Sequence, residues 1–152
     1  MSNRQKAADI LNDLIQLNND RVAGFEKALS DIKEENVDLK ALFEEYANQS
    51  RTYGQELTAL VASYGEDFDK GTSVGGTLHR AWIDVKSLFG GNDRESILNE
   101  AERGEDAIKK AYTEALSDGD LTAEAESVVR KQSEGIHNAH DKIKALRNIA
   151  RS

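Results

Sequence analysis

Two of the three histidines stand close together near the end of the sequence, where they could bind a metal ion. His137 and His140 are three residues apart, so on a helix they share one face, as metal ligands would. Glu134 precedes His137 by three residues and completes a Glu-x-x-His sequence, which also arises by chance in a helix rich in charge. The other interpretation, which we favour, is that His140 is a partly buried polar residue of the core with His137 on its flank. His79, the third histidine, is expected at the surface.

The rest of the sequence offers little catalytic chemistry. It has no cysteine, which excludes disulfides, iron–sulfur clusters and thiolate metal sites. No phosphate-binding glycine loop, nucleophile elbow or kinase motif occurs, and helix spacing supports no Ser-His-Asp arrangement. We therefore predict no catalytic residues and favour a protein that is not an enzyme.

Composition and charge restrict the classes of partner and the cellular location that we expect. The chain has 152 residues, so we expect a single domain over residues 1–152. Its formal net charge of −8 argues against nucleic acid and anionic membrane surfaces as partners, since both require a basic patch. No apolar run approaches the roughly 20 residues of a membrane span. The N-terminal residues lead into an amphipathic pattern without a signal sequence, so we expect a cytoplasmic protein.

Long amphipathic segments must position these side chains. The chain has no proline, and 38% of its residues are hydrophobic and 32% charged, a balance typical of helices with one buried stripe and a wide solvated face. Apolar residues of the first segment are spaced alternately four and three apart, as on a helix that packs in a bundle. Asn36 is expected to separate the first two helices and to cap the second. The predicted helices span residues 4–33, 37–64, 93–116 and 122–150.

Polar residues interrupt the predicted apolar stripes. Asn18 lies in the first stripe, Gln49 in the second and Glu105 in the third. If no metal binds there, we expect these three side chains and His140 to form a buried polar layer. Its hydrogen bonds would fix the register of the helices, because each buried polar group left unpaired costs about 1–3 kcal/mol.

The connection between the second and third helices is long and has its own pattern. Residues 66–91 contain an amphipathic piece bracketed by glycine pairs, with Trp82 and Phe89 on its apolar face. We expect a crossover with a short helix lying across the bundle, and a coiled-coil rod is the weaker alternative. We favour the interpretation that this apolar face covers the hydrophobic core of the bundle. If the face is exposed instead, it would be the surface through which the protein forms a homo-oligomer.

An internal repeat relates the two halves of the chain. Residues 9–13, Asp-Ile-Leu-Asn-Asp, recur as Ser-Ile-Leu-Asn-Glu at 96–100. Residues 24–31, Gly-Phe-Glu-Lys-Ala-Leu-Ser-Asp, recur as Ala-Tyr-Thr-Glu-Ala-Leu-Ser-Asp at 111–118. Both matches share one offset of 87 residues without a gap, which indicates a duplicated helical hairpin. Under that offset Asn18 corresponds to Glu105, and we expect the two to face each other near the bundle centre.

These features resemble a known superfamily. Repeated hairpins, a long crossover with a helix, and a polar seam residue seven positions before an aromatic are similar to ferritin-like proteins. More narrowly, Leu-Asn-Asp-Leu-Ile at 11–15, Glu-Arg-Gly-Glu at 102–105 and the closing residues 136–143 resemble the PA2169 family, or DUF2383, four-helix-bundle proteins of unknown function. The resemblance implies an all-α, antiparallel four-helix bundle with the crossover between its second and third helices.

The superfamily resemblance also implies a di-iron or di-manganese site, made of one Glu from each of two helices and a Glu-x-x-His pair from each of the others. The corresponding positions of this sequence are, in chain order, Asn18, Tyr46, Gln49, Glu105, Glu134 and His137. The first three are not the carboxylates and histidine that such a site requires. The resemblance therefore predicts a degenerate di-metal site.

Three functions follow as hypotheses. We favour a ferritin-like bundle that is not an enzyme and holds no cofactor, with a stress-related role implied by family analogy alone. The second is a protein that binds iron or manganese at a reduced site formed by Glu105, Glu134, His137 and His140. The third is an adaptor that associates through the crossover face.

Overall fold

The computed structural model describes residues 3–32, 34–65 and 93–151. Within these residues the chain forms α1 (Asn3–Asp31), the short 3-10 helix η1 (Glu34–Asn36), α2 (Val37–Ser63), α4 (Arg94–Ser117) and α5 (Ala123–Arg151). No strand occurs in this part of the chain, so the all-α prediction is confirmed. Each long helix begins and ends within two residues of the predicted bounds.

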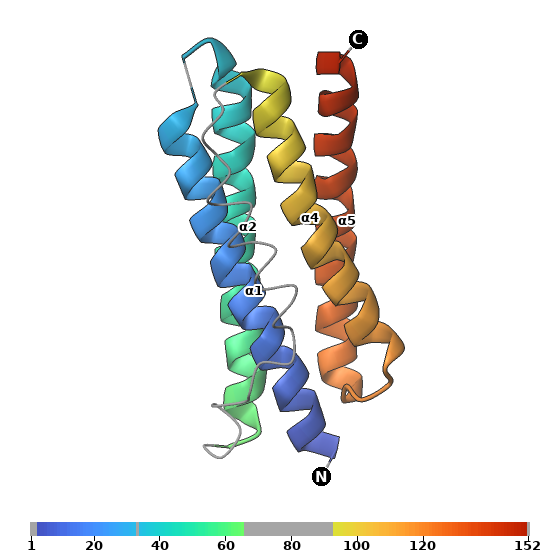
Figure 1. The fold of residues 1–152 in the computed structure, drawn as a ribbon. Helices are drawn as coiled ribbons and strands as arrows, with labels where there is room; N and C mark the ends of the chain where they lie inside the picture. The colour runs from blue at the N-terminus through green and yellow to red at the C-terminus, as the bar shows by residue number, and fades with distance from the viewer. Residues whose placement is uncertain (1–2, 33, 66–92, 152) are drawn as a thin grey trace.

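The long helices form two hairpins that pack side by side (Figure 1). α1 packs extensively against α2, and α4 against α5, while narrower seams join α1 to α4 and α2 to α5. α1 and α5 run in one direction and α2 and α4 in the other, so every helix is antiparallel to both of its neighbours. α2 therefore ends at the opposite end of the bundle from the start of α4. The predicted crossover, with Trp82 and Phe89, lies outside the described residues.

Turn and capping residues set several of the helix ends. The Asp93 carboxylate caps α4 by accepting a hydrogen bond from the backbone N–H of Ser96 at 2.8 Å. That bond lowers the pKa of Asp93, because it stabilises the charged form. Gly65 follows α2 and Gly119 follows α4 with φ of 110° and 72°, a region that favours glycine.

Asn36 is the N-cap residue of α2, as predicted, but its side chain makes no capping hydrogen bond. Its side-chain oxygen instead accepts a hydrogen bond from Arg94 Nη1 at 3.1 Å. Arg94 also donates to both carboxylate oxygens of Asp38, at 2.9 and 2.6 Å. These bonds join the start of α2 to the start of α4, and thus one hairpin to the other.

The core lies close to the predicted apolar stripes but is displaced from them by about one residue at several positions of α1 and α2. Buried stripe residues include Leu11, Phe25, Leu39, Leu57, Leu98, Ile108, Tyr112, Val129, Ile136 and Ile143. On α2, Phe43 is fully buried, whereas the neighbouring Leu42, which the sequence pattern places on the apolar stripe three residues after Leu39, is only partly buried. The ring of Phe25 lies 5.0 Å from that of Phe43 and 5.8 Å from that of Tyr46, measured between centroids. This aromatic cluster borders the polar centre described below.

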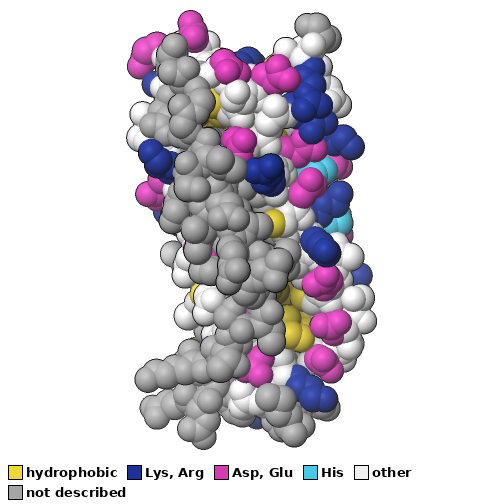
Figure 2. Space-filling view, viewed as in Figure 1, with side chains coloured by type: hydrophobic (Ala, Val, Ile, Leu, Met, Phe, Trp, Pro, Cys, Tyr) yellow, Lys and Arg dark blue, Asp and Glu magenta, His cyan; other side chains and the backbone are white. Residues whose placement is uncertain are grey.

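Charged side chains are frequent on the side of the described residues that Figure 2 shows. Figure 2 shows acidic and basic side chains intermixed over the side formed by α4 and α5, with imidazole groups between them. Val37 and Ile149 are the exposed large hydrophobic residues in the described ranges. No helix of the described residues is both long and apolar enough to span a membrane, which agrees with the absence of a membrane span predicted from the sequence.

Candidate functional site

A buried ion pair lies at the centre of the bundle. Arg21 of α1 donates from Nε to Glu105 Oε1 at 2.7 Å and from Nη2 to Glu105 Oε2 at 3.0 Å. Both side chains are 0% exposed. Two parallel charge-assisted bonds are the strongest arrangement open to such a pair, and each charge offsets part of the cost of burying the other.

The second helix supplies the remaining partners of the guanidinium. Arg21 Nη1 donates to Gln49 Oε1 at 2.8 Å and to Ser50 Oγ at 2.9 Å. The guanidinium carbon also lies 5.4 Å from the ring centroids of Phe25 and Tyr46, within the range of a cation–π contact. The cation is therefore enclosed by a carboxylate, two polar side chains and two aromatic rings.

Asn18 extends the network by one helical turn. Its Oδ1 accepts a hydrogen bond from Ser50 Oγ at 2.8 Å. Its Nδ2 donates to the Leu14 backbone oxygen at 2.8 Å and to the Tyr112 hydroxyl at 2.9 Å. Asn18 is completely buried, so each of these bonds replaces one that water would otherwise make.

Tyr112 carries the network to the last helix. Its hydroxyl donates to Gln132 Oε1 at 2.7 Å, and Gln132 Nε2 donates to Glu56 Oε1 at 2.9 Å on α2. Complete burial raises the pKa of Tyr112, and burial likewise raises the pKa of Tyr46 to about 12. Both phenols thus remain neutral at ordinary pH, and side chains of all four long helices join in one hydrogen-bonded chain.

The residues at the centre do not fit a di-metal site. Glu105 is the fully buried carboxylate there, and both of its oxygens accept hydrogen bonds from Arg21. The α2 positions where the resemblance implies ligands hold Tyr46 and Gln49, and Gln49 Oε1 also accepts from Arg21. A metal ion bound to Glu105 would have to displace the guanidinium and leave it buried without its partner, which is costly.

The structure separates the residues singled out in the sequence. It brings Asn18, Gln49 and Glu105 into one network, which also contains Arg21, and it places His140 elsewhere. Glu134 is exposed, and His137 is partly buried beside it at a shallow depression between α4 and α5. Burial lowers the pKa of His137, and the positive charge of Lys109 lowers it further.

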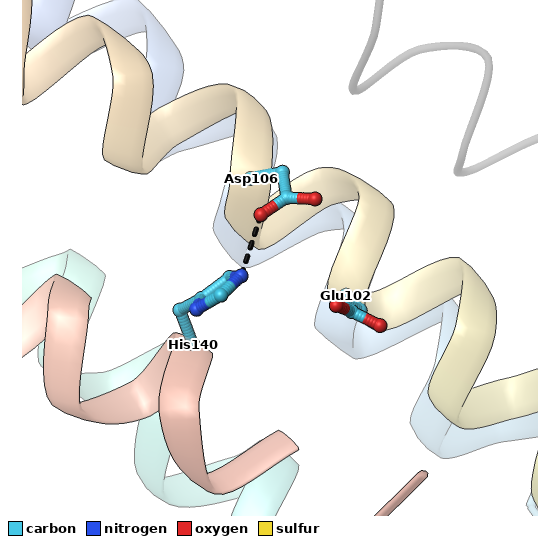
Figure 3. Close-up of side chains that lie close together, drawn as sticks. All are labelled: Glu102, Asp106 and His140. Atoms are coloured by element: carbon cyan, nitrogen blue, oxygen red, sulfur yellow. Dashed lines mark ion pairs between the residues drawn. The ribbon is translucent and has the colours of Figure 1, made fainter. Parts of the chain in front are cut away.

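His140 instead faces two carboxylates of α4 (Figure 3). Glu102 and Asp106 lie one turn apart on α4, and ligand atoms of these two residues and His140 all lie within 4.8 Å of one another. His140 Nε2 is 2.5 Å from Asp106 Oδ1, and His140 Nδ1 lies 3.1 Å from Asp141 Oδ1. The hydrogen bond between His140 and Asp141 is the main cause that lowers the pKa of Asp141. Glu102 also forms an ion pair with Arg147 of α5.

Arg21, Glu102 and Asp106 are absent from the sequence-based candidates. Charged residues on an amphipathic helix usually face solvent, so residue type alone gave no reason to place Arg21 and Glu102 inside. The four-residue spacing of Glu102 and Asp106 is a signal that could have found the cluster, since it places both carboxylates on one helix face. Arg21 carries a weaker signal, because it lies three residues after Asn18 and so near the same stripe.

Comparisons with known proteins identify a family but no activity. No curated protein matches the chain. One family model matches residues 6–118, and its description is a domain of unknown function, DUF2383. The match includes Arg21 and Glu105 and ends before α5. Because it covers well over half of the chain, the protein belongs to the DUF2383 family.

Proposed function

We propose that this protein is a non-enzymatic helical bundle of ferritin-like descent, in which a structural ion pair stands where a di-metal centre would lie. The observation that carries the proposal is the bidentate contact between Arg21 and Glu105, with both side chains fully buried. One guanidinium supplies the positive charge that the buried carboxylate needs. The centre is then electrically balanced and hydrogen-bonded without an ion.

The rest of the network supports a structural role. Every polar contact around Arg21 joins two different helices, and the same holds for the bonds from Ser50 to Asn18 and from Tyr112 to Gln132. Such bonds are satisfied in one alignment of the helices and are broken when a helix slides by a turn. The network therefore specifies the register of the two hairpins, as buried polar groups do in some helical proteins.

A metal-content measurement tests this proposal. Apoprotein would be titrated with Fe²⁺ and with Mn²⁺, and bound metal counted by elemental analysis, in a His140→Ala background that removes the separate cluster near Asp106. We expect far less than one ion per chain, and no change on adding Glu105→Gln. Stoichiometric iron or manganese that disappears with Glu105→Gln would refute the proposal.

Ferritin-like ancestry, membership of the narrower PA2169 group, a cytoplasmic location and a stress-related role belong to this proposal as inferences from sequence. The duplicated hairpin and the up-down-down-up course of the helices in Figure 1 support the ancestry. The stress-related role rests on family analogy alone, and it is not inferred from any particular residue of the sequence. The adaptor hypothesis depends on Trp82 and Phe89, which lie outside the described residues.

A further inference from the structure

We infer that Glu102, Asp106 and His140 form a binding site for one divalent transition-metal ion, for which Zn²⁺ is the natural probe. The site lies between α4 and α5. It is separate from the central network, in which Glu105 forms its ion pair with Arg21. It goes beyond the proposed function, which concerns the centre of the bundle alone.

The imidazole of His140 is the main evidence. Its side chain is 6% exposed, and Nε2 has no hydrogen bond of acceptable geometry, although Asp106 Oδ1 lies 2.5 Å away. A buried nitrogen so close to a carboxylate oxygen, without a well-formed hydrogen bond, is an unsatisfied group. A metal ion held by the nitrogen and the carboxylates would satisfy it.

Asp141 prepares this imidazole for a metal ion. When His140 Nδ1 donates its proton to Asp141 Oδ1, which lies 3.1 Å away, Nε2 keeps its lone pair and faces α4. Histidine ligands in metalloproteins commonly donate their second nitrogen to a carboxylate in this way, which fixes both the tautomer and the orientation of the ring.

Charge and ligand type point to the class of ion. Glu102 and Asp106 bring two carboxylates to the cluster, and Asp141 places a third beside His140 Nδ1. Arg147 offsets the charge of Glu102 through their ion pair. One imidazole with carboxylates suits Zn²⁺ and its first-row neighbours, whereas Mg²⁺ and Ca²⁺ prefer sites made of oxygen alone. Asp106 is exposed, so the ion would be accessible from solvent and could retain water as a ligand.

Arg147 provides a direct way to distinguish this site from a surface ion-pair network. Its guanidinium binds Oε2 of Glu102, one of the two oxygens that this side chain could offer to a metal ion. Removing the guanidinium therefore frees a ligand and a negative charge for the ion. A purely structural network would only be weakened by the same change.

The test is a Zn²⁺ titration of the full-length apoprotein by calorimetry, with excess Mg²⁺ present. We expect one ion per chain, and affinity reduced about tenfold or more by His140→Ala and by Asp106→Asn. Asp106→Asn alters an exposed side chain, so the variant should keep its fold, which circular dichroism would verify. Arg147→Gln should tighten binding.

His137→Ala is the matched control, since it removes a neighbouring histidine of the same helix and should leave the affinity unchanged. The inference fails if no ion binds, if His137→Ala abolishes binding while His140→Ala does not, or if Arg147→Gln weakens binding. Because Glu105 is intact in all these variants, such a failure would leave the proposed function of the central network untouched.

Discussion

At the scale of single residues, Arg21 is the side chain that decides the chemistry of the bundle. Under the 87-residue offset of the internal repeat its counterpart is Ile108, which is fully buried in the core. The two halves therefore differ at this position by a charge. That charge neutralises Glu105, so the centre of the bundle is an ion pair instead of a carboxylate that is available to a cation.

Substitutions of the ion pair should show strong coupling. Arg21→Met alone leaves Glu105 buried without its partner and is expected to lower the free energy of unfolding by about 3–5 kcal/mol. Combining it with Glu105→Leu removes both charges, and the double variant should recover most of that loss. Urea unfolding of the two single variants and the double variant measures the coupling. Additive effects would contradict the arrangement described.

Buried phenols should make the protein sensitive to base. Burial raises the pKa of Tyr46, Tyr53 and Tyr112 above the ordinary value of 10.0, so above that pH the unfolded chain releases phenolic protons that the folded chain retains. Stability is then complete below pH 10.0 and falls as the pH rises through the folded values. Tyrosinate absorbance should increase together with the loss of helical circular dichroism, and Tyr112→Phe should make the decline less steep. Full ionisation of the phenols in a protein that stays helical would contradict this.

The polar residues of the seam show how far residue-level inference reaches. Asn18, Gln49 and Glu105 are conspicuous because they interrupt an apolar periodicity, and the structure brings them together. Arg21 is not conspicuous, because a charged residue next to a stripe usually faces water. Its burial depends on the facing carboxylate of α4, which is a tertiary contact that helix spacing does not contain.

At the scale of the helices, two glycines in long helices have opposite roles. A Cβ atom at Gly135 of α5 would overlap the Tyr53 hydroxyl of α2, whereas at Gly54 of α2 the nearest such atom, Asn19 Oδ1, is 4.0 Å away. Gly135 thus allows α5 to approach α2 beside the network. Gly54 has no comparable packing reason.

Alanine scanning of these glycines should separate packing from helix propensity. Gly54→Ala is expected to stabilise the protein by up to about 1 kcal/mol, since alanine is the better helix former. Gly135→Ala gains the same propensity but forces Tyr53 to move, so we expect net destabilisation. Thermal unfolding of the two variants tests the contrast, and equal shifts in Tm would show that the close contact is unimportant.

Helix existence and extent follow well from the sequence, because periodicity, the absence of proline and the turn residues all agree. Which face of a helix turns inward is harder to predict. On α2 the fully buried residue is Phe43 and not its neighbour Leu42, since α2 packs against both α1 and α5 and its buried face is wider than one stripe. The partners of His140 are likewise set by how α5 meets α4.

At the scale of the whole molecule, the two hairpins are joined at the centre by buried bonds and at one end by an exposed pair. Arg94 and Asp38 make the exposed pair, with side chains 34% and 58% exposed. Solvent screens such a pair, so removing one of its partners should cost far less than removing one partner of the buried pair of Arg21 with Glu105. The buried contacts therefore determine how firmly the hairpins associate.

Acid unfolding should reveal the small contribution of the exposed pair. The hydrogen bond from Arg94 lowers the pKa of Asp38 below 3.8, so its stabilising effect is present above that pH and is lost as the pH falls through the lowered value. Asp38→Asn should cost less than about 1 kcal/mol at neutral pH, and the difference from the native protein should vanish in strong acid. Urea unfolding at both pH values provides the measurement, and a neutral-pH cost that persists in acid would contradict it.

The distance in sequence between Arg21 and Glu105 bears on how the molecule folds. The two residues are 84 positions apart, whereas the contacts within each hairpin are made between adjacent helices. Closing the longer loop costs more chain entropy, so each hairpin should form before the two associate. We predict that Arg21 and Glu105 meet only after the transition state of folding, so conservative changes to them should accelerate unfolding while leaving the refolding rate nearly constant. The ion pair that fixes the register of the helices would in this way also determine how long the folded bundle persists before it unfolds.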